Sequence, residues 1–153
     1  MKATFAASSA LAILIAAPAF AQEGPSGDAE AGAQLFERQC ITCHVVVNDE
    51  GETLAGRNAR TGPNLYGVAG RVAGSVEDFR YSNGLEALNE MGTEWTEENF
   101  VGYVQDPTPW IRETADSNRL RGSMTWKVRS EEEAHDLYAY LYSLAPPEEG
   151  EGS

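Results

Sequence analysis

The sequence predicts an all-α domain in which long irregular segments connect about three to five helices. Two stretches, one early and one late in the chain, have apolar residues at helical spacing and begin with residues that cap helices. The region between them is interrupted repeatedly by glycine and proline, which favour turns and irregular backbone. No stretch has a convincing strand pattern. We therefore expect helices joined by loops, and no sheet.

Residues 1–21 have the pattern of a secretory signal peptide. Lys2 supplies the positive charge at the start, residues 10–17 (ALAILIAA) form the apolar stretch, and residues 19–21 (AFA) form a small-residue cleavage site. The apolar stretch is too short to cross a bilayer as a helix. We expect cleavage after Ala21 and export to the periplasm, with an uncleaved membrane anchor as the alternative.

The rest of the chain is expected to form one domain over residues 22–147, followed by an acidic, disordered tail at 148–153. The length of this domain and the apolar content of the whole chain, 42%, are sufficient for a single core. The net charge of −13 becomes more negative still when Lys2 is removed with the signal peptide. A nucleic acid needs a basic face to bind, so it is excluded as a partner. We expect a monomer.

The helices near the two ends of this domain have the clearest signals. Asp28 can cap a first helix that continues to Gln39. Ser130 and Glu133 form a capping box at the start of a last helix, which the prolines at 146–147 end. The apolar residues that share a helix face are Ala31, Leu35 and Phe36 in the first helix and Leu137, Tyr140, Leu141 and Leu144 in the last.

Between these two helices the sequence favours shorter elements. Residues 45–60 are polar and contain two glycines, which predicts a long loop. A short helix is expected at residues 85–91. A longer helix begins after Thr96 and ends at Pro107. Residues 108–126 are predicted to be a loop with at most a short helical piece. The stripe of the longer helix consists of Phe100, Tyr103 and Val104.

The most specific motif is C-x-x-C-H, formed by Cys40, Cys43 and His44. It is the attachment signature of a c-type haem. Two thiols can add across the two vinyl groups of a porphyrin, and the imidazole that follows can bind the iron. On a helix, residues at i, i+3 and i+4 lie on one face, so the three side chains point the same way. The motif predicts one covalently bound haem c.

Other roles for the two cysteines fit the sequence less well. A redox dithiol of the thioredoxin type expects a βαβ pattern nearby, whereas the residues before Cys40 predict a helix. A structural zinc site needs four ligands, and the chain offers no further cysteine and only His135 in addition to His44. A structural disulfide across three residues would leave His44 without a role.

His44 can fill only one axial position of a haem iron, and three residues are candidates for the other. Met91 and Met124 can each be core residues, the usual role of methionine. His135 lies near the acidic start of a predicted helix, where a solvated side chain is expected. Met124 follows Gly122 and Ser123 in a loop, which could bring its thioether to the face opposite His44. A thioether and an imidazole leave no open position and raise the potential, so such a site transfers single electrons.

These motifs resemble those of the class I cytochromes c, and in particular the bacterial cytochrome c2 group. The resemblance covers nearly all of the chain after the signal peptide. The fold that it implies is the class I cytochrome c fold, with helices and long loops wrapped around one haem. The residues that carry it are Gly32, Phe36, the C-x-x-C-H motif, residues 61–71 (TGPNLYGVAGR), Tyr81, Trp95, Tyr103, Asp106, Pro107, Met124 and residues 139–141 (AYL).

The resemblance implies roles for residues on both sides of the haem. Met124 matches the family's axial methionine, and Tyr103 matches the tyrosine close to its sulfur. Pro63 matches the proline whose neighbouring carbonyl orients the proximal histidine. Residues implied near the haem propionates are Arg71, Tyr81 and Trp95. Those implied in the contact between the first and last helices are Gly32, Phe36 and Tyr140.

The family typically meets acidic partners through lysines around the haem edge, but only Lys127 remains in the chain after the signal peptide. Arginine is expected to replace them. No acid lies between Glu52 and Glu77, and five basic residues face only two acids in residues 110–129. The rest of the chain is strongly acidic, so a dipolar molecule is predicted. The residues expected to dock the partner are Arg57, Arg60, Arg112, Arg119, Arg121, Lys127 and Arg129.

These observations predict a soluble periplasmic carrier of single electrons that catalyses no net reaction itself. The resemblance implies a cytochrome bc-type quinol-oxidising complex as its donor. A terminal oxidase, a photosynthetic reaction centre or another reductase would be its acceptor. Two other classes of function stay open. One is a haem protein with an open distal site, acting as a peroxidase-like enzyme or a gas-binding protein. The other is a dithiol or metal-binding domain without haem.

Overall fold

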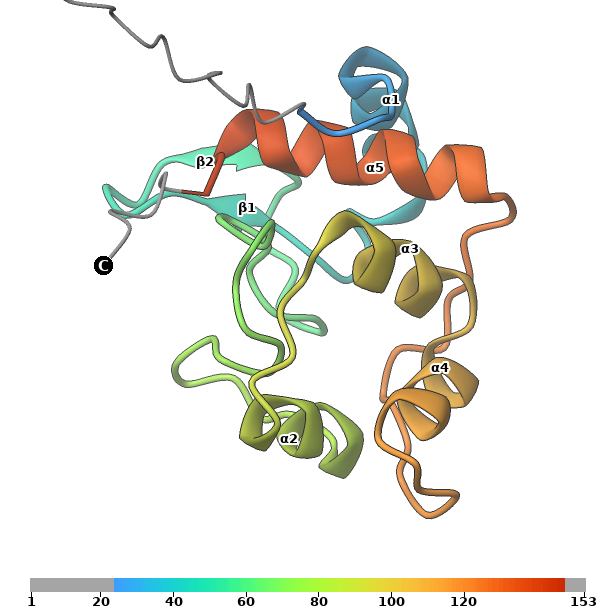
Figure 1. Ribbon diagram of the computed structural model, residues 1–153. Coiled ribbons are helices and arrows are strands. Elements are labelled where there is room, and N and C mark those ends of the chain that lie inside the picture. Colours follow the sequence, from blue (N-terminus) through green and yellow to red (C-terminus); the bar gives the residue numbers. More distant parts are fainter. Residues whose placement is uncertain (1–23, 148–153) are drawn as a thin grey trace, which may run out of the picture.

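The computed structural model describes residues 24–147, so the signal peptide expected at 1–21 and the tail expected at 148–153 lie outside it. The described chain is mostly helix with a little sheet (Figure 1), which confirms the all-α prediction. Within residues 24–147 no helix is long and apolar enough to span a bilayer. The elements are α1 (Ala29–Gln39), β1 (Val46–Val47), β2 (Thr53–Ala55), α2 (Asn83–Glu90), α3 (Glu97–Gln105), α4 (Pro107–Thr114) and α5 (Glu131–Leu144).

Helices α1 and α5 begin where their capping residues predict. The Asp28 carboxylate accepts hydrogen bonds from the backbone N–H groups of Glu30 and Ala31, at 2.8 and 3.0 Å. The Ser130 hydroxyl accepts one from the N–H of Glu133 at 3.2 Å. Each bond satisfies a donor that the first helical turn would otherwise leave without a partner. Both predicted helices are confirmed.

The two helices lie against each other at one side of the molecule (Figure 1). Their backbones approach closely at Gly32, where a Cβ atom would collide with the carbonyl group of Asp136 and lie 2.8 Å from Cβ of Tyr140. One turn further on, the rings of Phe36 and Tyr140 pack with their centroids 5.7 Å apart. The contact between the first and last helices is therefore confirmed, and Gly32 permits it because it has no side chain.

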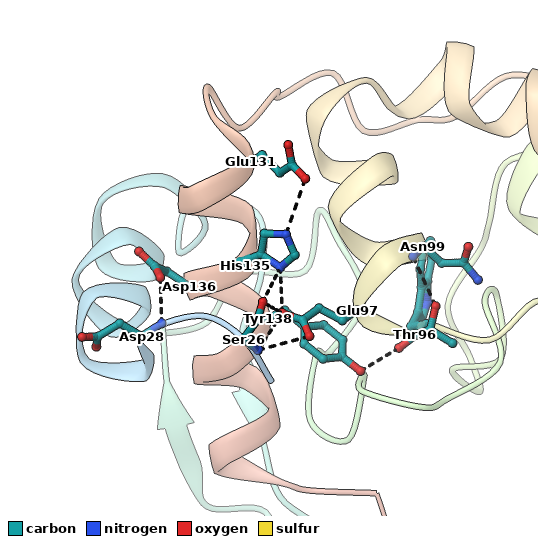
Figure 2. Close-up of polar contacts among 10 residues, drawn as sticks. Ser26, Asp28, Thr96, Glu97, Asn99, Glu131, His135, Asp136 and Tyr138 are labelled. Carbon is teal, nitrogen blue, oxygen red and sulfur yellow. Dashed lines mark hydrogen bonds and ion pairs between the residues drawn. The ribbon is translucent and has the colours of Figure 1, made fainter. Parts of the chain in front are cut away.

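The segment that precedes α1 is fastened to α5 and α3 (Figure 2). The backbone N–H and the hydroxyl of Ser26 both donate to the Glu97 carboxylate, at 3.0 and 2.7 Å. Nδ1 of His135 lies 2.7 Å from the same carboxylate and 3.0 Å from the Ser26 hydroxyl. The backbone N–H of Asp28 donates to the Asp136 carboxylate at 2.7 Å. We call this group of five residues the N-terminal junction.

The expectation that His135 is a solvated side chain is wrong. Its side chain is 29% exposed and is held between Glu97 and Ser26. The reason is that the segment before α1 folds back along α5, so closely that a Cβ atom at Gly27 would collide with the His135 backbone. A sequence pattern within α5 alone contains no sign of this long-range contact.

Helices α2 and α3 fall near their predicted positions. Helix α2 starts two residues earlier than expected, at Asn83, and ends at Glu90. Helix α3 is capped by Thr96, whose hydroxyl accepts from the N–H of Asn99 at 3.2 Å. Its buried residues are Phe100, Val101 and Val104. The predicted stripe is therefore correct except that Val101, rather than Tyr103, is its third fully buried member.

For residues 108–126 the sequence predicts a loop with at most a short helical piece, and the structure has the eight-residue helix α4 at the start of this stretch. Pro107 stops α3, because it has no N–H to donate, and then occupies the first turn of α4. Asp106 alone separates the two helices. Helix α4 buries Ile111 and ends at Thr114, so only residues 115–126 form the predicted loop.

The absence of strands is also a wrong expectation. Residues 45–60 contain a small antiparallel hairpin in which Val46 pairs with Ala55 and Val47 pairs with Thr53. Gly51 has a φ of +82° and allows the turn between the two strands. Strands of two and three residues are too short to produce a recognisable alternation of apolar and polar residues. The hairpin buries Val46 completely and joins it to the core.

Candidate haem-binding site

The C-x-x-C-H motif continues the last turn of α1. The N–H groups of Cys43 and His44 both donate to the carbonyl of Cys40, at 3.0 and 2.9 Å. This turn places the three side chains at helical spacing, as the sequence predicts. Both cysteines are half-buried, and Cys40 packs against the hydrophobic core. The motif therefore lies at the boundary between the core and the loops that follow.

Nδ1 of His44 lies 3.0 Å from the carbonyl oxygen of Pro63, which fixes the direction of the imidazole ring. Burial lowers the pKa of His44 below its ordinary value, and the hydrogen bond to Pro63 opposes this effect only in part. The ring is therefore neutral near neutral pH. With a proton on Nδ1 directed at Pro63, the lone pair on Nε2 is free to bind a metal.

Gly62 is not among the residues that the sequence assigns to the site, yet it touches the same ring. Its N–H donates to the carbonyl of Cys43 at 2.7 Å. A Cβ atom at Gly62 would lie 2.5 Å from Nδ1 and 2.7 Å from Nε2 of His44. Any side chain there would displace the imidazole. The only sign of this role in the sequence is that Gly62 lies between Thr61 and Pro63.

The loop that carries Pro63 is fastened by Asn64 and Arg71. The Asn64 side chain donates to the carbonyl of Val47 at 2.7 Å and accepts from the N–H of Val47 at 3.0 Å. The Arg71 guanidinium donates to the carbonyls of Tyr66 and Asn64, at 2.6 and 3.1 Å. The hairpin strand β1 and Arg71 therefore hold the loop that orients His44. Sequence analysis misses Asn64 because its partner strand is itself unexpected.

The state of the Cys40 thiol argues against a redox dithiol. Burial, with a further contribution from the charge of Cys43, raises the pKa of the Cys40 thiol to about 12. Reactive cysteines in dithiol oxidoreductases have the opposite shift, toward the thiolate. In the part of the chain that the structure describes, no three His, Cys, Asp or Glu side chains are grouped to hold a metal ion.

The three candidates for the second axial ligand have different surroundings. Met91 is 55% exposed at the end of α2. His135 is engaged in the N-terminal junction. Met124 is half-buried and packs against the hydrophobic core. Of the three candidates, Met124 is therefore the one whose side chain lies against the core. Met91 is exposed to solvent, and the His135 ring is hydrogen-bonded elsewhere.

The segment before Met124 is fixed to two helices. The N–H of Gly122 donates to the hydroxyl of Thr108 in α4, and the N–H of Arg121 donates to the side-chain oxygen of Asn83 in α2, both at 3.1 Å. Sequence analysis does not identify these anchors, since α4 is not expected there. They mean that the position of Met124 depends on the packing of α2 and α4.

Three aromatic rings that share the hydrophobic core with Met124 pack into one cluster. Trp95 lies 4.9 Å from Tyr103 and 6.0 Å from Trp110, measured between ring centroids, and Tyr103 lies 5.9 Å from Trp110. Burial, with a smaller contribution from Tyr81, raises the pKa of Tyr103 to about 12. Tyr103 therefore keeps its hydroxyl proton and can act as a donor. Trp110 is an aromatic member of the site that the sequence does not indicate.

A group of polar side chains gathers at Tyr81. Burial raises the pKa of Tyr81, and the hydrogen bond from the N–H of Val76 and the charge of Arg71 oppose this effect. Burial likewise lowers the pKa of Arg71. The neighbouring Ser82 hydroxyl is buried and has no hydrogen-bond partner within residues 24–147. A hydroxyl with free hydrogen-bonding capacity and a half-buried guanidinium fit the carboxylates of a porphyrin.

The basic residues predicted to dock a partner are not all equally available. Arg112 is half-buried and donates from Nε to the carbonyl of Leu120 at 3.0 Å. Lys127 forms an ion pair with Asp106. Besides Lys127, the exposed members of the set are Arg57, Arg60, Arg119, Arg121 and Arg129.

The helices and the motif together define a class of protein. An all-α domain presents two thiols and an oriented neutral imidazole from one turn, and it also contains a cluster of aromatic rings and, within residues 24–147, a buried hydroxyl without a hydrogen-bond partner. These are the features of a domain that holds a haem covalently.

Comparison with known proteins identifies the family. The family model for cytochrome c matches residues 29–145. Cytochrome c2 of Rhodovulum adriaticum is 60% identical over 124 residues, which cover 81% of this chain and 98% of the relative. Cytochrome c2 of Cereibacter sphaeroides is 50% identical over 146 residues, covering 95% and 98%. A crystal structure of cytochrome c2 from Rhodobacter sphaeroides superimposes with a TM-score of 0.76 at 50% identity, covering 78% and 98%.

The chain belongs to the cytochrome c family, as a class I member of the bacterial cytochrome c2 group. It is an electron-transfer protein and not an enzyme, and it carries one covalently bound haem c. The resemblance inferred from the sequence is confirmed.

Proposed function

We propose that the protein is a soluble periplasmic carrier of single electrons whose haem iron is bound by His44 and Met124. The observation that carries this proposal is the different placement of the three candidate ligands. Met124 is half-buried beside the core, Met91 is 55% exposed, and His135 is occupied by Glu97. A bound haem supplies a metal centre that changes its charge by one electron. The chain excludes water from it and leaves no coordination position for a substrate.

Each part of the site has a task in such a carrier. Pro63 and Gly62 hold the His44 ring in one orientation, so Nε2 stays directed at the same point. The contacts of Arg121 and Gly122 with α2 and α4 hold the Met124 segment. Tyr81, Ser82 and Arg71 offer hydrogen bonds and positive charge to the porphyrin carboxylates. Trp95 and Tyr103 fill the space around the ring.

The proposed donor is a cytochrome bc-type quinol-oxidising complex. The proposed acceptor is a photosynthetic reaction centre, a terminal oxidase or another reductase. Export would occur through the signal peptide at 1–21, which implies a mature protein that begins at Gln22. The named relatives are cytochromes c2, which supports this placement. The N-terminal sequence of protein recovered from the periplasmic fraction tests the cleavage site.

The ligand assignment is tested with Met124→Ala and a matched control, Met91→Ala. Loss of the thioether from iron should abolish the weak charge-transfer band at the red end of the ferric spectrum and allow small ligands to bind. Met91→Ala should leave the spectrum as it is in the wild type. If Met91→Ala abolishes the band while Met124→Ala retains it, the assignment is wrong. A high-spin spectrum in the wild type would favour a gas-binding or peroxidase-like protein instead.

A further inference from the structure

Helix α2 begins with Asn83 and Gly84, which form the only Asn–Gly pair in the sequence. Such a pair is chemically labile, because glycine has no side chain to shield its backbone nitrogen and is flexible enough to bring that nitrogen to the asparagine side chain. Attack of the nitrogen on the side-chain carbon expels ammonia. Asn83 is exposed to solvent, so the water that completes this reaction has access to it.

Packing requires glycine at position 84. Gly84 is buried, and a Cβ atom there would lie 2.6 Å from the carbonyl oxygen of Arg121 and 3.0 Å from Cγ2 of Ile111. The first of these neighbours is backbone, which cannot move aside as the end of a flexible side chain does. The fold therefore demands the residue that makes Asn83 labile.

The backbone of Arg121 holds both groups that would react. The N–H of Gly84 donates to the carbonyl of Arg121, and the N–H of Arg121 donates to the side-chain oxygen of Asn83, both at 3.1 Å. The Ser82 hydroxyl, at the usual capping position, makes no cap hydrogen bond. The start of α2 is thus fastened by a distant peptide group instead of a side-chain cap.

We propose that Asn83 is a modification site, which is protected while the segment before Met124 lies on α2 and is deamidated when that segment leaves. In the closed form, the nitrogen of Gly84 keeps its proton on the Arg121 carbonyl, and the helical backbone holds it away from the Asn83 side-chain carbon. Departure of the segment removes the restraint on both groups, and α2 can fray from its first residue. The protection itself does not depend on which residue binds the iron, but its link to haem ligation rests on the proposed function.

The reaction needs no reagent other than water. The nitrogen of Gly84 loses its proton to solvent and bonds to the side-chain carbon of Asn83. The bond from that carbon to Nδ2 breaks, and Nδ2 takes up a proton and leaves as ammonia. Water then opens the cyclic imide at either carbonyl, which gives aspartate or isoaspartate at this position and adds a negative charge. Isoaspartate lengthens the main chain by a carbon atom, so the N–H of Gly84 no longer meets the Arg121 carbonyl in the original register.

The test follows deamidation of the haem-loaded protein in mildly alkaline buffer, by mass spectrometry of the tryptic peptide 81–112. This peptide also contains Asn89 and Asn99, which are followed by larger residues and serve as internal controls. Asn83 should react about twentyfold or more slowly in the folded protein than in the same protein unfolded in guanidinium chloride, because each of two hydrogen bonds favours the closed form by roughly a factor of five. Equal rates in the two states would overturn the proposal. An isoaspartyl methyltransferase identifies the isoaspartate product.

Thr108→Val separates opening of this segment from unfolding of the whole domain. The Thr108 hydroxyl accepts from the N–H of Gly122 at 3.1 Å, so its loss should loosen the segment and raise the rate at Asn83 about fivefold. Thr96→Val is the matched control, because it removes the same kind of bond, from the N–H of Asn99 at 3.2 Å, at the start of α3. It should leave the rate at Asn83 unchanged. If the two variants raise this rate equally, deamidation follows general unfolding and the proposal is wrong.

Met124→Ala separates the modification site from the ligand assignment. Loss of the bond to iron should free the segment and raise the rate at Asn83, whereas Met91→Ala should not. If Thr108→Val raises the rate and Met124→Ala leaves it unchanged, the ligand assignment fails and the modification site is supported. If Met124→Ala changes the haem spectrum as expected but neither variant raises the rate, the modification proposal is overturned and the ligand assignment stands.

Discussion

The N-terminal junction with the α1–α5 contact and the loops around the haem-binding motif are stabilised in different ways. In the first region, side chains form hydrogen bonds with one another, as those of Ser26, Glu97 and His135 do (Figure 2). In the second region, the buried Ser82 hydroxyl has no partner within residues 24–147, and the half-buried Met124 side chain lies against the core. The first region is therefore stabilised by contacts within the chain, whereas the second is the region for which we propose haem contacts.

The largest difference between the two regions should follow from preventing haem attachment. In the double variant Cys40→Ala/Cys43→Ala, we expect the protein to lose more than about 4 kcal/mol of stability, as is typical when a structural cofactor is removed. Hydrogen exchange should show that amide protons in residues 61–82 and 121–128 lose protection first, because these are the loops that we propose to pack on the haem. Protection in α1 and α5 should persist longest. Equal loss of protection in both regions would show that they are one cooperative unit.

A smaller effect is expected from Gly32→Ala in the α1–α5 contact. The added methyl group would collide with the Asp136 carbonyl, and backbone cannot yield as a flexible side chain does. Overpacking of this kind costs about 1–3 kcal/mol and outweighs the gain of less than about 1 kcal/mol in helix propensity. Urea unfolding should show a lower midpoint with an unchanged haem spectrum. Gly24→Ala is the control, because nothing lies within 4 Å of its added Cβ.

Gly62→Ala tests the other region with the same chemical change. Its methyl group would press on the His44 ring, which can yield only by stretching its hydrogen bond to Pro63. We expect a loss of about 1 kcal/mol in stability, the net contribution of one hydrogen bond, together with a changed haem spectrum and reduction potential. Gly32→Ala should thus change stability without changing the haem spectrum, whereas Gly62→Ala should change both. A Gly62→Ala protein with an unchanged spectrum would contradict the assignment of Gly62 to His44.

The smallest effect concerns pH and the N-terminal junction. Burial raises the pKa of Glu97, but hydrogen bonds from Ser26 and His135 outweigh it, and the pKa lies below its ordinary value of 4.5. Such a carboxylate stabilises the fold above pH 4.5 and loses this contribution as the pH falls through its lowered pKa. Glu97→Gln should therefore cost less than about 1 kcal/mol at pH 7 and nothing in acid. Glu98→Gln, an exposed neighbour, should show no such pH-dependent difference.

The sequence predicts the first region better than the second. The ends of α1 and α5 follow from Asp28, Ser130 and the terminal prolines, because capping depends on residues close in the chain. The hairpin is missed because two or three strand residues carry no periodic signal. For α4 the sequence allows only a short helical piece without bounds, because Pro107 both ends one helix and begins another. In the site, the covalent motif is evident from spacing alone.

Long-range contacts account for the residues that sequence reasoning misses or misplaces. Gly62 matters because of a ring 18 positions earlier in the chain, and Trp126 is held by Gln39 from the other side of the motif. His135 is misjudged because its partner Ser26 precedes α1. Such pairs have no local pattern. Only the folded chain brings them together.

The single residue between α3 and α4 has a consequence for the speed of electron transfer. The backbone N–H of Asp106 donates to the carbonyl of Gly102 at 3.4 Å, and its carbonyl accepts from the N–H of Trp110 at 3.0 Å. The residue that joins the two helices is therefore hydrogen-bonded to both. Thr108, one residue into α4, holds the Gly122 segment that precedes Met124. A shift of the segment before Met124 would therefore strain its hydrogen bond to α4, and α4 is joined to α3 through Asp106 alone. Ligands that keep their geometry when the iron gains or loses an electron give a small reorganisation energy. A small reorganisation energy lowers the activation barrier for electron transfer.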